Sequence, residues 1–132
     1  MRYLLDTHAL IWAITEPEKL SESVREILTT PESVVVVSTI SFWEIALKFS
    51  LGKLDINSLN PEDFHKASEE LGFGILDLVA ETSSSYYQLT ATYHKDPFDR
   101  MLIWQALCHR YTLISDDENI RKYASDGLKV VW

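Results

Sequence analysis

The stretch Val34-Val35-Val36-Val37-Ser38 decides the class of fold. Four consecutive β-branched valines disfavour a helix and are typical of a strand that is covered on both faces of a sheet. Four other short apolar runs are also predicted to be strands, at residues 2–5, 74–78, 111–115 and 128–131. Helical patterns separate these runs. This alternation predicts a three-layer α/β/α sandwich around a central, mostly parallel sheet.

The segments between the strands carry helix signals. Helices are expected over residues 41–51, 61–71, 80–92 and 97–110. The second of these begins with Asn60 as a good N-cap and Pro61 at the first helical position. The third is rich in serine, and the fourth is apolar on most faces, so it is expected to be deeply packed.

Length and composition are those of one globular domain spanning residues 1–132. Twelve Lys and Arg stand against 20 Asp and Glu, which gives a net charge of −8. This balance argues against a protein that holds nucleic acid on a broad basic face, but not against an enzyme whose acids bind metal ions. The single cysteine, Cys108, excludes an internal disulfide and favours a cytoplasmic location. No apolar run approaches the ~18 residues of a membrane span, so no membrane association is expected.

Acidic residues gather at one edge of the predicted sheet, where strands end and helices begin. They are Asp6, Glu44, Asp96, Asp99, Asp116 and Asp117. Asp6 ends the first strand, and Glu44 is expected in the first turn of the helix that follows the second strand. Ligands of such sheets bind beyond the carboxyl ends of the strands, so this edge is the expected place of a site.

Each acid also has a purely structural interpretation as part of a helix cap. The residues that fit caps are Asp6, Ser41 together with Glu44, Asp96, and either Ser115 or Asp116. Caps do not require an acid, however, because Ser, Thr or Asn serves as well. Carboxylates from four segments at one edge would repel one another, and a divalent cation such as Mg²⁺ or Mn²⁺ removes that conflict. The chain has neither the Cys/His spacing of a zinc site nor a Gly-rich phosphate loop.

Other side chains that could carry chemistry weigh less. The four histidines are scattered and are interpreted as surface or cap residues. His94 is a partial exception because it precedes the Asp96-Pro97 turn. Cys108 lies in the most apolar helix and is expected in the core.

Four motifs resemble those of the PIN-domain ribonucleases, and most closely the toxin components of VapBC-type toxin–antitoxin pairs. They are Tyr3-Leu4-Leu5-Asp6-Thr7-His8, Ser41-Phe42-Trp43-Glu44-Ile45, His94-Lys95-Asp96-Pro97-Phe98-Asp99-Arg100-Met101-Leu102 and Leu113-Ile114-Ser115-Asp116-Asp117. Their order and spacing match the family from end to end, and the Asp-Pro-Phe-Asp-Arg stretch is the most specific. The resemblance implies a single PIN-like domain over residues 1–132.

The resemblance also assigns residues by position. The implied catalytic and metal-binding quartet is Asp6, Glu44, Asp99 and Asp117. Supporting roles are implied for Thr7, Ser115, Asp96, Asp116 and Arg100. The two hydroxyls would orient carboxylates or waters, Asp96 would cap its helix, and Asp116 leaves the assignment of Asp117 somewhat open. Arg100 would bridge acids in the metal-free state, and Arg100, Lys95 and Lys48 are candidate phosphate contacts.

The function that the resemblance implies is Mg²⁺- or Mn²⁺-dependent hydrolysis of RNA by an endoribonuclease toxin. Such toxins form homodimers and are inhibited by a cognate antitoxin, here expected in a hydrophobic groove along residues 10–14 and 42–49. Two alternatives remain open. A receiver-type signalling domain that binds Mg²⁺ would need an acidic pair after the first strand, where Asp6 stands alone. A non-catalytic binding module would keep only the fold and would not need the quartet.

Overall fold

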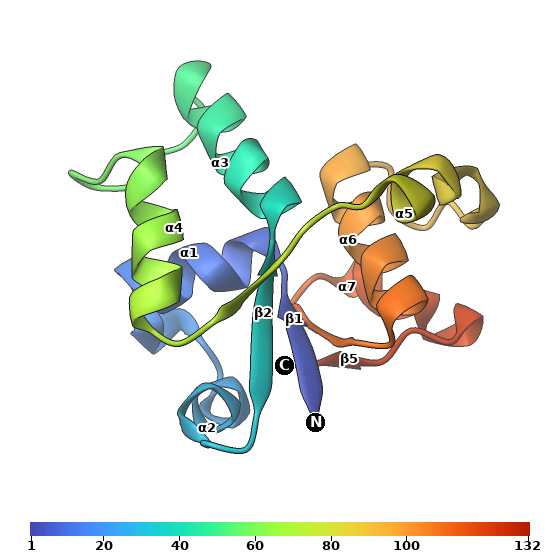
Figure 1. Ribbon diagram of the computed structural model, residues 1–132, viewed down its shortest axis with the longest axis horizontal. Helices are drawn as coiled ribbons and strands as arrows, with labels where there is room; N and C mark the ends of the chain where they lie inside the picture. Colours follow the sequence, from blue (N-terminus) through green and yellow to red (C-terminus); the bar gives the residue numbers. More distant parts are fainter.

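A five-stranded sheet lies at the centre of the computed structural model, which describes residues 1–132 (Figure 1). The strands are β1 (Arg2–Leu5), β2 (Val34–Ser38), β3 (Gly74–Leu76), β4 (Thr112–Ile114) and β5 (Val130–Val131). Their order in the sheet is β3-β2-β1-β4-β5, and all four pairings are parallel. All the predicted strands are therefore present, although β3, β4 and β5 are shorter than expected.

Helices fill the connections between the strands. The α-helices are α1 (Thr7–Thr15), α2 (Glu22–Thr29), α3 (Thr39–Ser50), α4 (Pro61–Glu70), α5 (Ala80–Ser84), α6 (Pro97–His109) and α7 (Glu118–Arg121). Three 3-10 helices accompany them, η1 (Pro17–Lys19), η2 (Tyr86–Gln88) and η3 (Lys122–Asp126). None of these helices is both long and apolar enough to cross a membrane.

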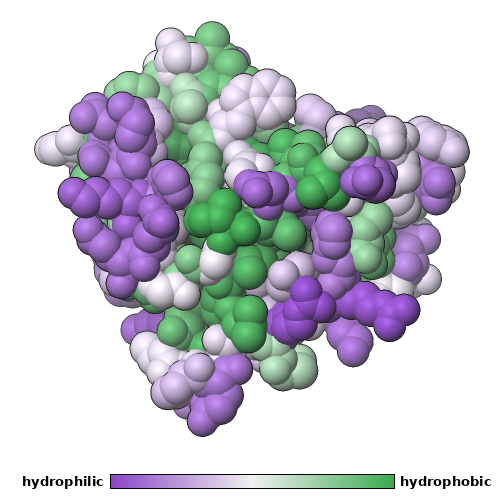
Figure 2. Space-filling view, viewed as in Figure 1, coloured by the Kyte–Doolittle hydropathy of each residue, from purple (hydrophilic) through white to green (hydrophobic).

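Two cores, one on each face of the sheet, make the fold three layers deep. Side chains alternate across a strand, so Leu5 packs with Leu10 of α1 and Phe64 of α4, whereas Leu4 packs with Leu102 of α6. Figure 1 accordingly shows α4 and α6 on opposite sides of the strands. In Figure 2, hydrophobic residues occupy the middle of one face, beside the hydrophilic outer side of α4. The predicted α/β/α sandwich is confirmed.

The long helix predicted over residues 80–92 is wrong in its extent. α5 ends at Ser84, and only the single turn η2 follows it. Farther along, the guanidinium group of Arg100 binds the carbonyl oxygens of Leu89 and Ala91, at 2.7 and 2.6 Å. Those carbonyls are therefore satisfied by a side chain instead of by a helix. The segment that leads to the acidic edge is held by these tertiary bonds.

Helix α2 has no counterpart among the predicted helices. The Ser21 hydroxyl accepts a hydrogen bond from the amide of Val24 at 3.1 Å, which caps the helix. Val24 is the only fully buried residue of α2. Ile27 and Leu28 also pack against the core, so Val24, Ile27 and Leu28 form an apolar stripe at helical spacing. The signal is therefore present in the sequence, and the predicted helices omit it.

The sheet register sets where the acidic edge lies. Leu5, the last residue of β1, pairs with Ile114 of β4. Asp6 and Ser115 follow them directly, and the amide of Asp6 still donates to the carbonyl of Ile114 at 3.1 Å. Asp6 and Ser115 therefore lie side by side at the carboxyl ends of adjacent strands.

Candidate metal centre

Asp6 is buried at the end of β1 and caps α1. Its Oδ1 accepts a hydrogen bond from the amide of Ala9 at 2.7 Å, and the side chain also accepts one from the Ser115 hydroxyl. Burial nevertheless raises the pKa of Asp6 to about 6, because the two hydrogen bonds only partly offset the loss of hydration. The charge of Asp117 also acts to raise it. Asp6 is thus a helix cap whose negative charge is poorly compensated.

Glu44 is buried on α3 and is held by two side chains. The Thr7 hydroxyl donates to its Oε1 at 2.6 Å, and Lys48, one turn farther along α3, forms a short ion pair with its Oε2. Burial acts to lower the pKa of Lys48, but the contact with Glu44 outweighs it and raises that pKa. The lysine therefore stays charged and compensates Glu44 within the protein.

The capping box predicted for Ser41 and Glu44 is not formed. Ser38 caps α3 instead, with its hydroxyl accepting from the amide of Ile40 at 3.1 Å, so the helix begins two residues earlier. Glu44 consequently lies in the second turn of α3 and not in the first. The buried Ser41 hydroxyl lies 3.0 Å from that of Thr7. Thr7 therefore joins α1 to α3 and orients Glu44.

Asp96 caps α6, as predicted, and so leaves Asp99 free. Oδ1 of Asp96 accepts from the amides of Phe98 and Asp99, at 2.8 and 3.1 Å. The Asp99 carboxylate has no amide partner of its own. Burial, followed by the charges of Glu44 and Asp96, raises the pKa of Asp99 to about 7, although His94 acts to lower it. Asp99 is therefore the acid whose ionisation is most opposed by its surroundings.

Asp117 follows β4 and caps α7. Its Oδ1 accepts from the amides of Asn119 and Ile120, at 2.7 and 3.2 Å, and its Oδ2 faces His94. Burial alone would raise the pKa of Asp117, but the hydrogen bonds from His94 and from the two amides outweigh it and lower the pKa. Asp117 is therefore an ionised carboxylate with one oxygen directed into the site.

Neither Asp116 nor Ser115 caps α7, so that prediction is wrong. The buried Ser115 hydroxyl accepts from the amide of Asp117 at 3.1 Å and donates to Asp6, so it joins two members of the quartet. The Asp116 side chain is 55% exposed and lies 3.4 Å from Arg121. Asp116 is therefore an exposed acid that pairs with Arg121 and does not contact His94.

The ring of His94 lies between Asp99 and Asp117. Its Nε2 is 3.1 Å from Oδ2 of each carboxylate. Its Nδ1 accepts a hydrogen bond from the amide of Asp96, also at 3.1 Å. His94 is absent from the predicted site residues. In the sequence, its only signal is its position two residues before Asp96.

Arg100 does not bridge acids, contrary to the prediction. Its guanidinium donates to the carbonyls of Leu89 and Ala91 and to the hydroxyls of Tyr86 and Tyr123, the latter two at 2.7 and 3.0 Å. These bonds hold the chain before α6 against η2 and η3. Arg100 is a structural clasp.

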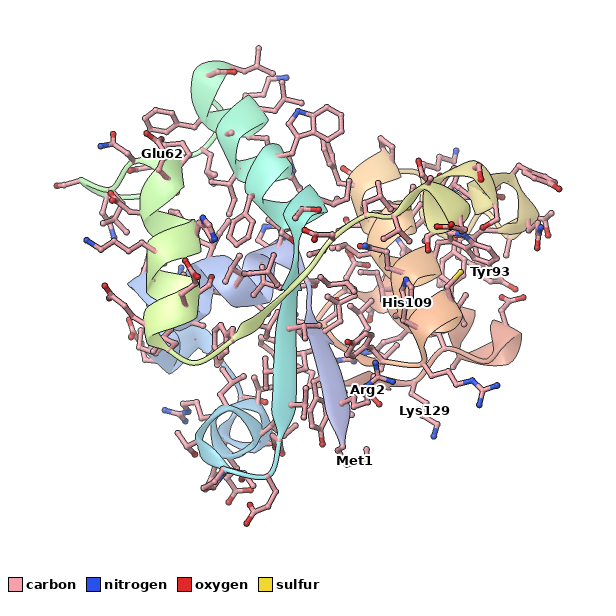
Figure 3. The ribbon with its side chains drawn as sticks, in the orientation of Figure 1. Met1, Arg2, Glu62, Tyr93, His109 and Lys129 are labelled. Carbon is pink, nitrogen blue, oxygen red and sulfur yellow. The ribbon has the colours of Figure 1, made fainter.

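Two lysines near the acids differ in whether their ammonium group is already paired. The Lys48 ammonium is engaged by Glu44. Lys95 is exposed and forms no ion pair. Figure 3 shows Arg2 and Lys129 near the N-terminus, at the opposite end of the strands.

Cys108 is exposed and not in the core, which corrects the prediction for that residue.

The donor set fits a hard divalent cation. One potential ligand atom from each of His94, Asp99 and Asp117 lies within 4.8 Å of the others. Carboxylate oxygens are the ligands that Mg²⁺ and Mn²⁺ prefer. The pKa of Asp6 and that of Asp99 are both raised, and a cation at this edge would remove the cause. The structure thus brings Asp99 and Asp117 closest together, with Asp6 and Glu44 near enough to influence them.

Two small hollows open beside the acids. One, of about 230 Å³, is lined by Asp6, Asp117, Asp116, His8, Ala9, Trp12 and Trp132. The other, of about 210 Å³, is lined by Thr7, Glu44, Lys48, His8, Ile11, Ile45, Lys53 and Leu54. Small hollows therefore lie on both sides of the acidic edge.

Comparison with known proteins identifies the family of the chain. The PIN domain family matches residues 3–126. Ribonuclease VapC22 of Mycobacterium tuberculosis is 25% identical over 130 residues, which cover 98% of this chain and 97% of that protein.

Solved structures are similar over the same length. VapBC2 from Rickettsia felis, bound to a DNA fragment from its promoter, matches with a TM-score of 0.69 at 17% identity, over 99% of this chain and 98% of that one. VapBC-1 from nontypeable Haemophilus influenzae matches with a TM-score of 0.66 at 22% identity, over 99% and 97%. At these identities the structures speak for the fold. The family match over almost the whole sequence goes further, and the chain belongs to the PIN domain family.

Proposed function

We propose that this protein is an endoribonuclease toxin that hydrolyses RNA phosphodiester bonds with Mg²⁺ or Mn²⁺. The observation that carries the proposal is the convergence of Asp99 and Asp117, which each bring a carboxylate oxygen within 4.8 Å of the other and of a His94 nitrogen. Burial and neighbouring carboxylates raise the pKa of Asp99 to about 7, which agrees with this placement. Charge that its own surroundings leave uncompensated is what a cation site requires. The ribonuclease named among its relatives supports the choice of RNA as substrate.

In this proposal the residues of the chain mainly position the cation and orient the carboxylates that bind it. Asp99, Asp117 and Asp6 would hold the cation. Glu44 would lie beside them, with its charge neutralised by Lys48. Such a cation, when bound, acidifies a water molecule and stabilises charge on phosphate oxygens. The Ser115 hydroxyl fixes two of these carboxylates relative to each other.

The remaining groups would act on the substrate. Thr7 orients Glu44, and the unpaired ammonium of Lys95 can contact a substrate phosphate. Hydrolysis of the phosphodiester would leave a 5′-phosphate and a 3′-hydroxyl.

Cleavage of a structured RNA pool in the presence of Mg²⁺ or Mn²⁺ tests the activity. Wild type should cleave, and Asp6→Asn and Asp99→Asn should be strongly impaired. Asp116→Asn is the matched control, because that carboxylate is exposed and turned toward Arg121. Undiminished cleavage by both Asp6→Asn and Asp99→Asn would exclude the assignment. Absence of cleavage by wild type, together with no binding of Mn²⁺, would favour a non-catalytic binding module. The match to the PIN domain removes the ground for a receiver-type domain.

The proposal includes partners and a compartment. A cognate antitoxin would cover the apolar side chains left exposed on α3, where Trp43 is 60% and Phe49 42% exposed. Leu10 is fully buried and would not take part, which narrows the expected groove. A homodimer in the cytoplasm completes the proposal. Light scattering of the purified chain, alone and with the product of the neighbouring gene, tests both associations.

A further inference from the structure

One side chain at the acidic edge has no role in the proposed reaction. The His94 side chain is only 12% exposed, and its Nε2 lies 3.1 Å from Oδ2 of both Asp99 and Asp117. These carboxylates come from different elements, α6 and the turn after β4. A single nitrogen therefore contacts the two oxygens that lie where a cation would bind.

The hydrogen bonds to the ring decide which nitrogen carries the proton. The amide of Asp96 donates to Nδ1 at 3.1 Å, so Nδ1 presents its lone pair. In the neutral ring the proton is then on Nε2, which donates to Oδ2 of Asp117 and lies 3.1 Å from Oδ2 of Asp99. A histidine that binds a metal through Nε2 must present a lone pair there and usually donates from its other nitrogen. His94 has the opposite arrangement.

The main chain of His94 is fixed as well. Its carbonyl accepts from the Arg100 guanidinium at 3.3 Å, and its amide donates to the Tyr123 hydroxyl at the same distance. The ring is therefore presented to the two carboxylates by an anchored backbone. To leave them it needs only side-chain rotation, which breaks the bond from Asp96 to Nδ1.

We propose that His94 is an internal competitor of the metal: its Nε2–H occupies the Asp99–Asp117 pair in the metal-free protein and must be displaced when a divalent cation binds. The proposal rests on the proposed function only in taking these carboxylates as the cation site. His94 is thus a positioning residue that keeps the two carboxylates together without a cation. It also weakens their affinity for one.

Binding of Mn²⁺, followed by the electron paramagnetic resonance signal of the free ion, tests this directly. His94→Leu removes the donor and should bind Mn²⁺ about tenfold more tightly than wild type, as expected for the loss of one competing hydrogen bond to charged groups. His94→Gln is the matched control, because its amide nitrogen can reach a similar position and donate. It should stay near the wild-type affinity. His94→Ala repeats the test if the leucine variant does not fold.

The outcomes separate the proposal from the function on which it rests. Weaker binding of Mn²⁺ by His94→Leu or His94→Ala would show that His94 is a ligand and would overturn the proposal. An unchanged affinity would show that His94 does not compete with the cation, and it would overturn the proposal as well. Asp99→Asn, measured in the same series, should lose binding. If wild type itself binds no Mn²⁺, the proposed function falls, and the competition falls with it.

The ring itself provides a second readout. Nitrogen chemical shifts of the metal-free protein should show the proton of His94 on Nε2. Saturating Mg²⁺ should move that signal toward the value of a solvent-exposed imidazole. A proton found on Nδ1, or a ring signal that Mg²⁺ leaves unchanged, would contradict the displacement.

Discussion

Asp99 and Asp117 contact the same nitrogen of His94 at the same distance, yet their pKa values move in opposite directions. The other oxygen of Asp117, Oδ1, accepts hydrogen bonds from two amides of α7. Asp99 lacks such partners because Asp96 already accepts from the first amides of α6. Two acids of one site are therefore stabilised very differently by the chain.

A cation is needed more at Asp99 than at Asp117. The negative charge of Asp117 is compensated locally, first by the hydrogen bond from His94 and then by two helix amides, and its side chain is partly exposed to solvent. The negative charge of Asp99 is opposed by burial and by Glu44 and Asp96. A cation would therefore compensate mainly the charge of Asp99. This difference can be tested by making the same substitution, Asp to Asn, at both residues.

The largest expected effect is on RNA cleavage. Asp99→Asn should slow single-turnover cleavage at saturating Mn²⁺ by roughly 10²–10³-fold, because the variant loses a ligand of the cation that would stabilise charge on the phosphate oxygens. Asp117→Asn should slow it less, by roughly 10–100-fold, because the amide side chain can still cap α7. A greater loss in Asp117→Asn than in Asp99→Asn would contradict the larger need for a cation at Asp99.

The next effect is on the clasp that presents His94 to both acids. Arg100→Met removes donors from partly buried carbonyls and hydroxyls and should lower the free energy of unfolding by about 3 kcal/mol. Urea denaturation measures it. Arg121→Gln, which loses only an exposed pair with Asp116, is the control and should change stability by less than about 0.5 kcal/mol. Equal effects of the two substitutions would contradict the stabilising role of the Arg100 hydrogen bonds.

The smallest effect has the most informative sign. The pKa of Asp99 is raised in the folded state, so ionisation of Asp99 destabilises the metal-free protein above pH 7, and this cost disappears as the pH falls toward the unfolded pKa. Asp99→Asn should therefore raise the free energy of unfolding at pH 8 and change it little at pH 4.

Asp117→Asn should do the opposite. The pKa of Asp117 is lowered, so its ionisation stabilises the fold above the unfolded pKa, and this stability is lost as the pH falls through the folded value. The substitution should cost about 0.5–1 kcal/mol at pH 8, a small figure because the exposed carboxylate is screened by solvent. Urea denaturation in the presence of a chelator measures both variants. Changes of the same sign would contradict the difference between the two acids.

Much of the fold followed from local pattern. The valine run of β2 and the Asp96-Pro97 start of α6 are signals that neighbouring residues alone determine, and both predictions were confirmed. The start of α3 was missed by two residues, because Ser38 and Ser41 are equally good caps in sequence. Tertiary contacts distinguish them, because Ser38 donates to Gln105 at 2.6 Å and Ser41 lies 3.0 Å from the Thr7 hydroxyl.

The site was harder to predict where it depends on tertiary bonds. The parallel register alone brings Asp6 beside Ser115, so their proximity could be inferred. The position of His94 could not, because it depends on the path of the chain that Arg100 fixes. Arg100 was itself expected at the acids, since nothing in the sequence shows that the carbonyls of Leu89 and Ala91 claim its guanidinium.

The most direct test of the central claim is the anomalous scattering of crystals soaked in Mn²⁺. A cation site at the acidic edge predicts one or two manganese peaks in direct contact with carboxylate oxygens of Asp99 and Asp117, with Asp6 and Glu44 in direct or water-mediated contact. A saturating soak that leaves this edge without a peak, or places manganese only on other residues, would contradict the account.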